Sequence, residues 1–240
     1  MAIQSIIPST SAVDDLLWRH LQELPAFRAL LRAVEAHFYA DLPLPRPVLD
    51  LGCGDGHFAS VAFDEPLEAG FDPWWGPLTE ARARRAYCLL AQAEGARMPY
   101  PDNYFATIVS NSVLEHIPQV QPVLVEMARV LRPGGWFYFC VPGPEFLPFL
   151  SVGRALDGVG LRSPGETYRR FFNRVSRHYH CDGPAVWVRR RGGGGAAIGS
   201  LVALLYPPGT GSSGVGPLPG AALVGVQKTD RALGAVSLAG

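Results

Sequence analysis

The chain has 240 residues, with 21 basic (Lys and Arg) and 21 acidic (Asp and Glu) side chains, so its formal net charge is zero. A neutral chain gives no electrostatic reason to expect binding to nucleic acid or to an anionic membrane. The length suits one sizeable domain with a small appendage.

Cysteine usage and the absence of targeting signals indicate the compartment. Cys53, Cys88, Cys140 and Cys181 are scattered without a C-x-x-C pair, which is typical of reduced cytoplasmic cysteines. Residues 1–15 lack the basic and long apolar segments of a signal peptide. No apolar run approaches the roughly 20 residues of a spanning helix. We therefore expect a cytoplasmic protein without a membrane span.

Residues 14–38 carry apolar side chains at helical spacing, and Pro25 is expected to divide them into two helices. The proline-rich stretch that follows is a stiff linker. We interpret residues 1–46 as a helical lid and linker, in which Trp18 and Phe38 either cover a ligand or simply pack.

From residue 47, short apolar runs alternate with helical patterns. Strands are predicted at 48–51, 67–71, 92–94, 106–110 and 136–141, and helices at 58–63, 78–89 and 119–131. This alternation predicts an α/β fold, with a Rossmann-like, mostly parallel sheet and helices on both faces. Ligands of such sheets bind beyond the carboxyl ends of the strands, within a core of residues 47–143.

The last quarter of the chain departs from this pattern. Residues 144–191 are predicted to be mostly helical, whereas residues 192–240 are rich in Gly and Pro and predict neither helices nor a set of strands. We expect the C-terminal strands to be incomplete or disordered, and a shifted reading frame would also leave an exposed edge on the sheet. The alternatives are a genuine tail and a shifted reading frame from Gly192 onward, which would put enzymatic turnover in doubt.

The stretch VLDLGCGDGHFA, residues 48–59, leads from a strand through a glycine-dense turn toward a helix. A dinucleotide-binding turn, G-x-G-x-x-G, requires its third glycine at position 57, where the chain has His57. The chain instead has Gly52, Gly54 and Gly56 behind Asp50. Glycines permit positive φ and close approach of a ligand. The amides that open the following helix favour an anionic group.

This D-x-G-x-G-x-G pattern resembles class I S-adenosylmethionine-dependent methyltransferases. Later segments are similar in the same order: Asp72 after the second strand, Glu94-Gly95, SNSVLEHI at 110–117, and residues 122–142. The chain departs from the family at Phe105-Ala106, where Phe-Asp is usual. The resemblance implies S-adenosyl-L-methionine as cofactor, with its ribose at Asp72 and its adenine near Glu94. The cofactor-binding residues are then Asp50, Gly52, Cys53, Gly54, Gly56, Asp72, Glu94, Gly95, Ala96, Asn111 and Glu115.

The resemblance also implies where the acceptor is methylated. His116 is our candidate base, although a helix-entry histidine bonded to backbone is the alternative. Segments after the fifth strand build the acceptor site in this family, so residues 144–191 are assigned that role, with His178 and His180 as candidate contacts. His178, His180 and Cys181 are too close in sequence to hold one tetrahedral ion without a distant fourth ligand, and we expect no metal.

The function predicted from sequence is methyl transfer to a small-molecule acceptor. A cofactor-binding protein without turnover is the alternative, and a nicotinamide oxidoreductase is disfavoured by His57. Nucleic acid is not expected as a partner, because the chain is neutral and lacks the D/N-P-P-[YF] tetrad. The sequence indicates neither the acceptor atom nor the oligomeric state.

Overall fold

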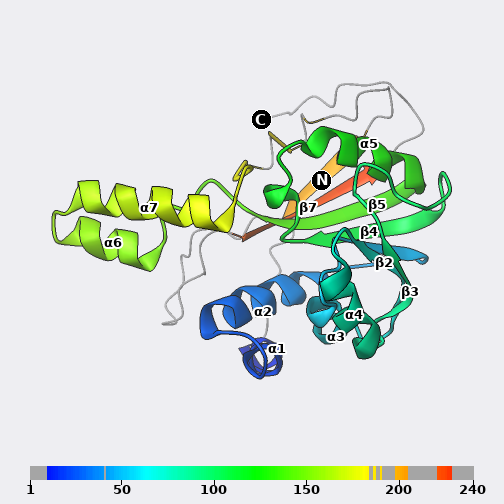
Figure 1. The fold of residues 1–240 in the computed structure, drawn as a ribbon, viewed down its shortest axis with the longest axis horizontal. Coiled ribbons are helices and arrows are strands. Elements are labelled where there is room, and N and C mark those ends of the chain that lie inside the picture. Colours follow the sequence, from blue (N-terminus) through cyan, green and yellow to red (C-terminus); the bar gives the residue numbers. More distant parts are fainter. Residues whose placement is uncertain are drawn as a thin grey trace.

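A seven-stranded sheet in the order β3-β2-β1-β4-β5-β7-β6 forms the centre of the molecule (Figure 1). The computed structural model describes residues 10–40, 42–183, 186–187, 190, 198–204 and 221–228. The parallel strands are β1 (Val48–Leu51), β2 (Leu67–Asp72), β3 (Tyr87–Gln92), β4 (Phe105–Asn111) and β5 (Leu131–Pro142). β7 (Ala221–Lys228) runs antiparallel to β5, and β6 (Ile198–Leu204) runs antiparallel to β7.

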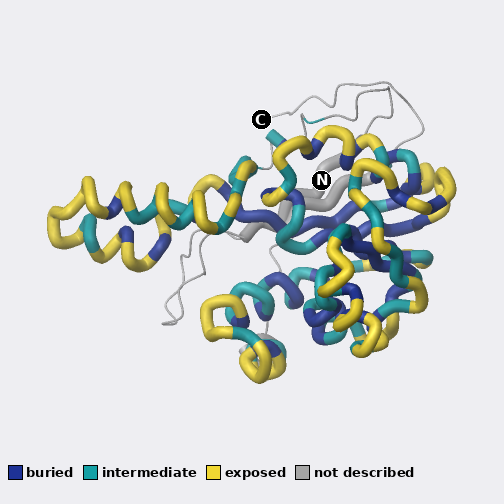
Figure 2. The backbone as a smooth tube through the Cα atoms, in the orientation of Figure 1, coloured by how far each residue is buried: buried dark blue, intermediate teal, exposed yellow. Residues whose placement is uncertain are grey.

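Helices cover both faces of the sheet, which confirms the predicted fold class. Leu49 and Leu51 of β1 belong to the core under α5 (Val120–Val130). Val48 belongs to a second core, formed with residues of α2 (Ala26–Ala40) and α3 (His57–Ala62). Side chains of a strand alternate between faces, so Asp50 lies on the same face as Val48. Because both faces are covered, the inner strands β1 and β4 are buried along almost their whole length (Figure 2).

The remaining helices lie around this sheet. They are α1 (Thr10–Leu21), α4 (Trp75–Arg84), the short 3₁₀ helix η1 (Leu114–His116), α6 (Ser151–Gly158) and α7 (Arg162–Ser176). The predicted break at Pro25 is confirmed, because α1 ends at Leu21 and α2 begins at Ala26. α6 and α7 lie side by side and project from the body of the molecule (Figure 1).

The third strand begins earlier than the sequence predicted. A helix was expected over 78–89 and a strand at 92–94, but α4 ends at Arg84 and β3 starts at Tyr87. Arg85 adopts a left-handed φ of 56°, which ends the helix. The run Tyr87–Gln92 then pairs with β2, from Leu67 opposite Tyr87 to Asp72 opposite Gln92. Pairing with β2 therefore overrides the helical spacing of these apolar residues.

The sequence predicted no set of strands after residue 192, whereas the structure has two there, β6 and β7. β7 pairs with β5 from Gln227 opposite Trp136 to Ala221 opposite Pro142, and β6 lies beyond β7. The segment AALVGVQK lacks polar alternation, which concealed it as a strand. The other residues of 192–240, to which the alternative of a shifted reading frame applies, lie outside the described part of the chain.

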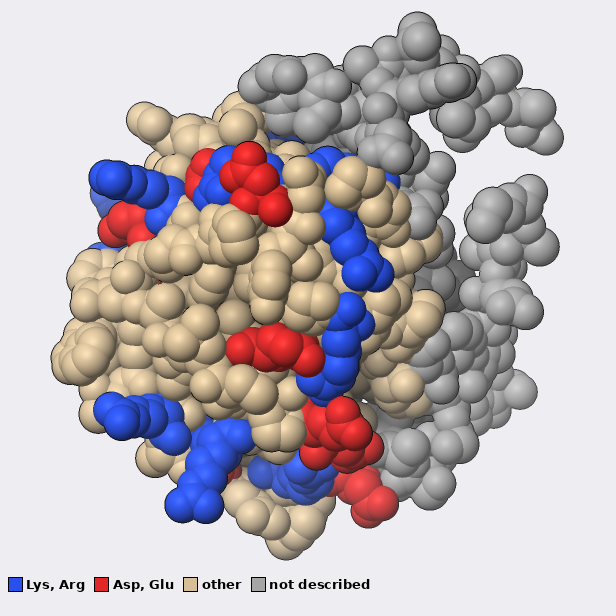
Figure 3. Space-filling view, turned by 90° about the vertical axis from the view of Figure 1, so that its right-hand side faces the viewer, with Lys and Arg blue, Asp and Glu red and all other residues tan. Residues whose placement is uncertain are grey.

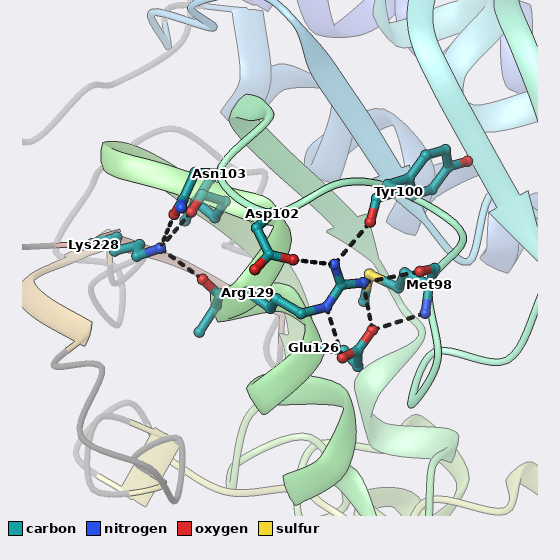
Figure 4. Close-up of polar contacts among 9 residues, drawn as sticks. Met98, Tyr100, Asp102, Asn103, Glu126, Arg129 and Lys228 are labelled. Carbon is teal, nitrogen blue, oxygen red and sulfur yellow. Dashed lines mark hydrogen bonds and ion pairs between the residues drawn. The ribbon is translucent and has the colours of Figure 1, made fainter.

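Lys228, at the end of β7, connects this strand by hydrogen bonds to earlier segments of the domain (Figure 4). Its Nζ donates to Asn103 Oδ1 at 2.7 Å and to the carbonyl oxygens of Ala128 at 2.9 Å and Leu131 at 2.7 Å. The three acceptors lie in the loop before β4, in α5 and at the start of β5. One ammonium group therefore holds the C-terminal strand against three earlier segments.

Arg129 of α5 similarly holds the loop that follows β3 (Figure 4). Its guanidinium donates to the carbonyl oxygens of Met98 at 2.9 Å and Tyr100 at 2.8 Å, and to Asp102 Oδ1 at 2.7 Å. Glu126 pairs with the same guanidinium at 2.8 Å. The planar group thus fixes the loop over residues 98–102, just after the Glu94-Gly95-Ala96 segment.

A pair of histidines joins α1 to α3. His20 is fully buried, and its Nδ1 lies 2.9 Å from His57 Nε2. His57 Nδ1 lies 3.4 Å from Glu23 Oε2, and Glu23 pairs with Arg84 at 2.6 Å. Burial, together with the neighbouring His57, lowers the pKa of His20 to about 4. His20 is therefore neutral in the folded protein at physiological pH.

We expect this pairing to make stability depend on pH. The unfolded chain takes up a proton on His20 near pH 6.5, whereas the folded chain does so only near pH 4, so stability falls as the pH is lowered through this window. The loss from this residue between pH 7 and pH 5 should approach about 2 kcal/mol. Urea unfolding at both pH values measures it. His20→Gln should lose less stability over the same interval, and an equal loss in both proteins would contradict the assignment.

Candidate functional site

The three glycines of the turn after β1 all have left-handed backbones, with φ of 77° at Gly52, 54° at Gly54 and 72° at Gly56. A Cβ added at Gly52 would lie 2.6 Å from the Val113 side chain, and one at Gly56 would lie 3.1 Å from Ala81 Cα. A Cβ at Gly54 would meet nothing within 4 Å. Gly52 and Gly56 thus permit close packing, whereas Gly54 faces open space at the carboxyl end of β1.

Asp72 ends β2 beside this open space. Its carboxylate is buried and accepts the backbone N–H of Gly54 at 3.1 Å and that of Trp74 at 2.9 Å, one on each oxygen. Each carboxylate oxygen keeps a free lone pair. The position agrees with the sequence prediction and suits the two hydroxyls of a ribose.

Other amides of the turn are engaged within the protein. The N–H groups of Gly52 and Cys53 both donate to the Phe71 carbonyl at 3.0 Å, and the His57 N–H donates to Asp55 Oδ1 at 3.0 Å. The sequence analysis expected the amides that open α3 to receive an anionic group. The His57 amide already has its acceptor, so an anion here would need other donors.

Asp50 carries a buried carboxylate, 5% exposed, close to Asp72. Its Oδ2 accepts the hydroxyl of Tyr87 at 2.7 Å. Burial raises the pKa of Asp50 to about 6; the Tyr87 hydrogen bond lowers it, and the nearby charge of Asp72 raises it further. This site therefore favours a positively charged ligand group. The sequence analysis missed Tyr87, because it placed that residue in a helix instead of β3.

The segment Glu94-Gly95-Ala96 follows β3 on the same side of the sheet. Its position relative to Asp72 is fixed by the Ala93 N–H, which donates to the Asp72 carbonyl at 3.2 Å. Glu94 and Ala96 are exposed, and a Cβ at Gly95 would lie 3.1 Å from Val123 of α5. The structure thus brings the predicted ribose and adenine positions together.

The end of β4 is covered by α2. Asn111 Nδ2 donates to Glu35 Oε2 at 2.8 Å, and the Ser112 hydroxyl donates to Glu35 Oε1 at 3.0 Å. Arg32 pairs with Glu35 at 2.6 Å and donates to the Ser112 hydroxyl at 2.9 Å. Sequence reasoning missed Arg32 and Glu35. The sequence signal that could have found them is a pair of opposite charges, three residues apart, next to the small apolar residues on the buried face of α2.

The two aromatic residues that the sequence predicted either to cover a ligand or to pack have different surroundings. Trp18 is 66% exposed, and Phe38 packs against the core formed by α2 and α3. Phe38 therefore follows the second alternative that the sequence left open, which was packing against the core. The contacts over the end of β4 come from Arg32 and Glu35 of α2.

Glu115, His116 and His178 form a cluster beyond the end of β4. Glu115 is 1% exposed, and its Oε1 lies 3.8 Å from His116 Nε2. The rings of His116 and His178 are 5.1 Å apart between centroids. One possible ligand atom from each of the three residues lies within 4.8 Å of the other two. Burial, with Glu35 adding to it, raises the pKa of Glu115 to about 8.

His180 is separated from this cluster, although the sequence paired it with His178. One of its ring nitrogens, Nε2, lies 2.9 Å from the Ile117 carbonyl oxygen, and the ring packs against Trp187. His178 instead contacts His116 and the ring of Phe146. Of His178 and His180, only His178 therefore lies beside His116, the candidate base.

A cavity of about 750 Å³ lies between α2, the segment after β5, α6 and α7. Its lining is mostly aromatic and aliphatic, with one cation; it includes Phe27, Leu31, Phe146, Tyr168, Phe172 and Arg154. Phe146 lies 5.5 Å from the His178 ring between centroids, so the cavity wall touches the Glu115–His116–His178 cluster. In the described part of the chain, no helix is long and apolar enough to cross a membrane.

Comparison with known proteins agrees with this geometry. Residues 49–139 match the family described as a methyltransferase domain. The trans-aconitate 2-methyltransferase of Methylobacterium nodulans is 37% identical over 108 residues, which cover 42% of this chain and 40% of that protein. The malonyl-[acyl-carrier protein] O-methyltransferase of Legionella pneumophila is 28% identical over 107 residues, covering 42% of this chain and 38% of that protein.

These alignments are partial: the chain spans about two fifths of the length of these curated relatives. A crystal structure from Thermotoga maritima, titled a possible histamine N-methyltransferase, covers 90% of this chain and 99% of its own. Its TM-score is 0.60 at 16% sequence identity, so the likeness is one of fold.

The different surroundings of the glycines predict different costs of substitution. Gly54→Ala introduces only backbone strain, which should cost about 1 kcal/mol of unfolding free energy. Gly52→Ala adds a collision with Val113 and should cost clearly more. Urea unfolding of the ligand-free variants measures both, and equal losses would contradict the open space assigned to Gly54.

Proposed function

We propose that the chain, whose residues 49–139 match the methyltransferase domain family, is an S-adenosylmethionine-dependent methyltransferase acting on a small-molecule acceptor. The observation that carries this proposal is the arrangement of Asp50, Gly54 and Asp72 around open space at the carboxyl ends of β1 and β2. Ligands of doubly wound sheets bind in this position.

The residues of this site fit S-adenosyl-L-methionine, which is the cofactor of this class. Asp50 is a buried carboxylate whose hydrogen-bond partner is a neutral hydroxyl, and it suits the cofactor's amino group. Asp72 has lone pairs for the ribose hydroxyls, and Gly54 has no side chain to obstruct the backbone. Gly95 and its neighbours would border the adenine. When bound, the cofactor supplies a methyl group that is attached to a positively charged sulfur.

The chain's own residues would contribute alignment and shelter from water. Methyl transfer needs the acceptor atom about 3–3.5 Å from the methyl carbon and in line with it. α2 covers the end of β4 through Arg32 and Glu35, and the aromatic cavity would hold the body of the acceptor. The polar groups at the acceptor side are Glu115, His116 and His178, and we assign acceptor activation to them.

The cavity favours an acceptor with an apolar or aromatic body and an anionic group. Its walls come from α2 and from residues 144–191, the segment that the sequence assigned to the acceptor. Arg154 is the cation of the lining and is suited to a carboxylate. Both curated relatives described above are named for acidic acceptors, trans-aconitate and malonyl groups. We therefore propose a small organic acid.

The surface gives no support for a nucleic-acid acceptor. On the face shown in Figure 3, basic side chains lie among acidic ones, and the formal net charge of the whole chain is zero. A nucleic-acid surface is normally a stripe or patch of basic residues. We propose a cytoplasmic location, because the four cysteines are free thiols.

An assay for S-adenosylhomocysteine tests the proposed function. The full chain is incubated with S-adenosylmethionine and a panel of aromatic and aliphatic acids, with matched alcohols and amines as comparison. We expect S-adenosylhomocysteine together with a methylated acid. Asp72→Ala should abolish the product, while Glu80→Gln, an exposed acid on α4, should not. Cofactor binding without turnover on any member of the panel would favour the non-catalytic alternative, and tight NADH binding without S-adenosylmethionine binding would contradict both.

Cofactor affinity should depend on pH through Asp50. The ligand's ammonium group needs the ionised carboxylate, whose pKa is about 6 without ligand. The dissociation constant of S-adenosylhomocysteine should therefore be constant above about pH 7 and rise about tenfold per pH unit below 6. Calorimetry across this range measures it.

Tyr87→Phe provides the matched variant for this titration. The Tyr87 hydroxyl lowers the pKa of Asp50, so its removal should shift the midpoint of the affinity curve to higher pH. Tyr104→Phe, at a largely exposed tyrosine, should leave the midpoint unchanged. A curve that is flat between pH 5 and 8 would exclude Asp50 as the partner of the amino group.

A further inference from the structure

The Glu115–His116–His178 cluster contains polar atoms that the fold buries without a partner. Among the described residues, Glu115 Oε2 and His178 Nδ1 are inaccessible to solvent and make no hydrogen bond. Glu115 itself is 1% exposed. Buried polar atoms are nearly always paired, because an unpaired one costs free energy. Two such atoms on residues of one cluster point to a missing partner.

The lone pairs of the cluster converge. His116 Nδ1 lies 3.3 Å from the Arg177 carbonyl oxygen, so this nitrogen carries the proton and donates. The other nitrogen, Nε2, then has its lone pair directed to the side of Glu115, whose Oε1 is 3.8 Å away. A histidine that ligates a metal typically donates its second ring N–H to a carbonyl in this way.

A backbone hydrogen bond holds the two halves of the cluster together. The Tyr179 N–H donates to the Glu115 carbonyl oxygen at 2.7 Å. Tyr179 directly follows His178 in the chain, and Arg177 directly precedes it. The segment after α7 is thereby fixed against η1. The sequence analysis sought metal ligands only within residues 178–181, and it therefore missed partners some sixty positions earlier in the chain.

We propose that Glu115, His116 and His178 bind one divalent metal ion of the zinc type. Two imidazole nitrogens and one carboxylate oxygen are a ligand set for Zn²⁺ or Fe²⁺, whereas Mg²⁺ prefers oxygen ligands alone. Ligands of a tetrahedral zinc ion lie about 3.4 Å apart. The three ligand atoms lie within 4.8 Å of one another, so small side-chain rotations bring them to that spacing.

Three protein ligands leave a coordination position open, as in catalytic zinc sites. The cluster adjoins the aromatic cavity through the contact of His178 with Phe146. A carboxylate oxygen needs no activation, whereas a hydroxyl group of the acceptor acid that binds the ion there loses its proton to water at lower pH than in solution. The resulting anion is the nucleophile that methyl transfer requires. This role rests on the proposed function, whereas metal binding itself does not.

The base role predicted for His116 and the ligand role use the same lone pair on Nε2. The two roles therefore exclude each other and have different consequences. A base requires no metal, so treatment with a chelator leaves turnover unchanged. A ligand makes turnover depend on the ion, so chelation stops the reaction and added Zn²⁺ restores it.

Metal titration of the purified full chain tests the site without an acceptor. After removal of metals with a chelator, Zn²⁺ is added in a calorimeter, and Co²⁺ is added in parallel for its visible absorption. We expect one ion per chain and the intense absorption bands of tetrahedral Co²⁺. Glu115→Gln, His116→Ala and His178→Ala should each weaken binding at least tenfold, and His180→Ala should leave it unchanged. His180 is the matched control for metal binding because its ring packs against Trp187 and it is not one of the three residues whose ligand atoms approach one another.

Binding of S-adenosylhomocysteine is measured on every variant. This binding shows that each variant is folded, and it distinguishes failure of the metal site from failure of the proposed function. Failure to bind one Zn²⁺ per chain, or binding that survives in both His116→Ala and His178→Ala, overturns the metal site and leaves the cofactor site intact. Zinc binding in a chain that does not bind S-adenosylhomocysteine supports the metal site and overturns the proposed function.

Discussion

Asp50 places a carboxylate inside the protein at the end of β1, with Asp72 nearby and the neutral hydroxyl of Tyr87 as its partner. Burial of a charge without an opposite charge is costly, and here it raises the pKa of Asp50 to about 6. The rest of the cofactor side depends on this constraint. The strand order β3-β2-β1-β4 places Asp72 and the glycine turn at the carboxyl ends of the strands, and the Tyr87 side chain reaches Asp50 from the amino end of β3. A cationic ligand group beside Asp50 would relieve the unfavourable burial.

The acceptor side is assembled from three segments that are distant in sequence. α2 supplies Arg32 and Glu35, the end of β4 and η1 supply Asn111 to His116, and the segment after α7 supplies His178. Hydrogen bonds join the first two segments, and the Tyr179 amide joins the last two. The proposed cofactor site thus lies on one βαβ unit, and the proposed acceptor site is completed by the later helices.

Local patterns sufficed to predict the parts of the site that lie along one strand and its turn. The glycines of 52–56, Asp50 and Asp72 are where the sequence placed them, because strand ends and glycine turns leave local signals. β3 was placed too late in the chain, and β6 and β7 were missed, since pairing with neighbouring strands decides their conformation. Tyr87 with Asp50, and Glu115 with His178, are contacts across the fold. No spacing within one segment reveals them.

The proposal that S-adenosylmethionine binds between Gly54 and Asp72 is tested most directly by a crystal structure of the full chain with S-adenosylhomocysteine. The ribose hydroxyls should lie within hydrogen-bond distance of Asp72, the amino group should contact Asp50, and the adenine should lie beside Gly95. Ligand density elsewhere in the chain, or a ribose that does not contact Asp72, would contradict the assignment.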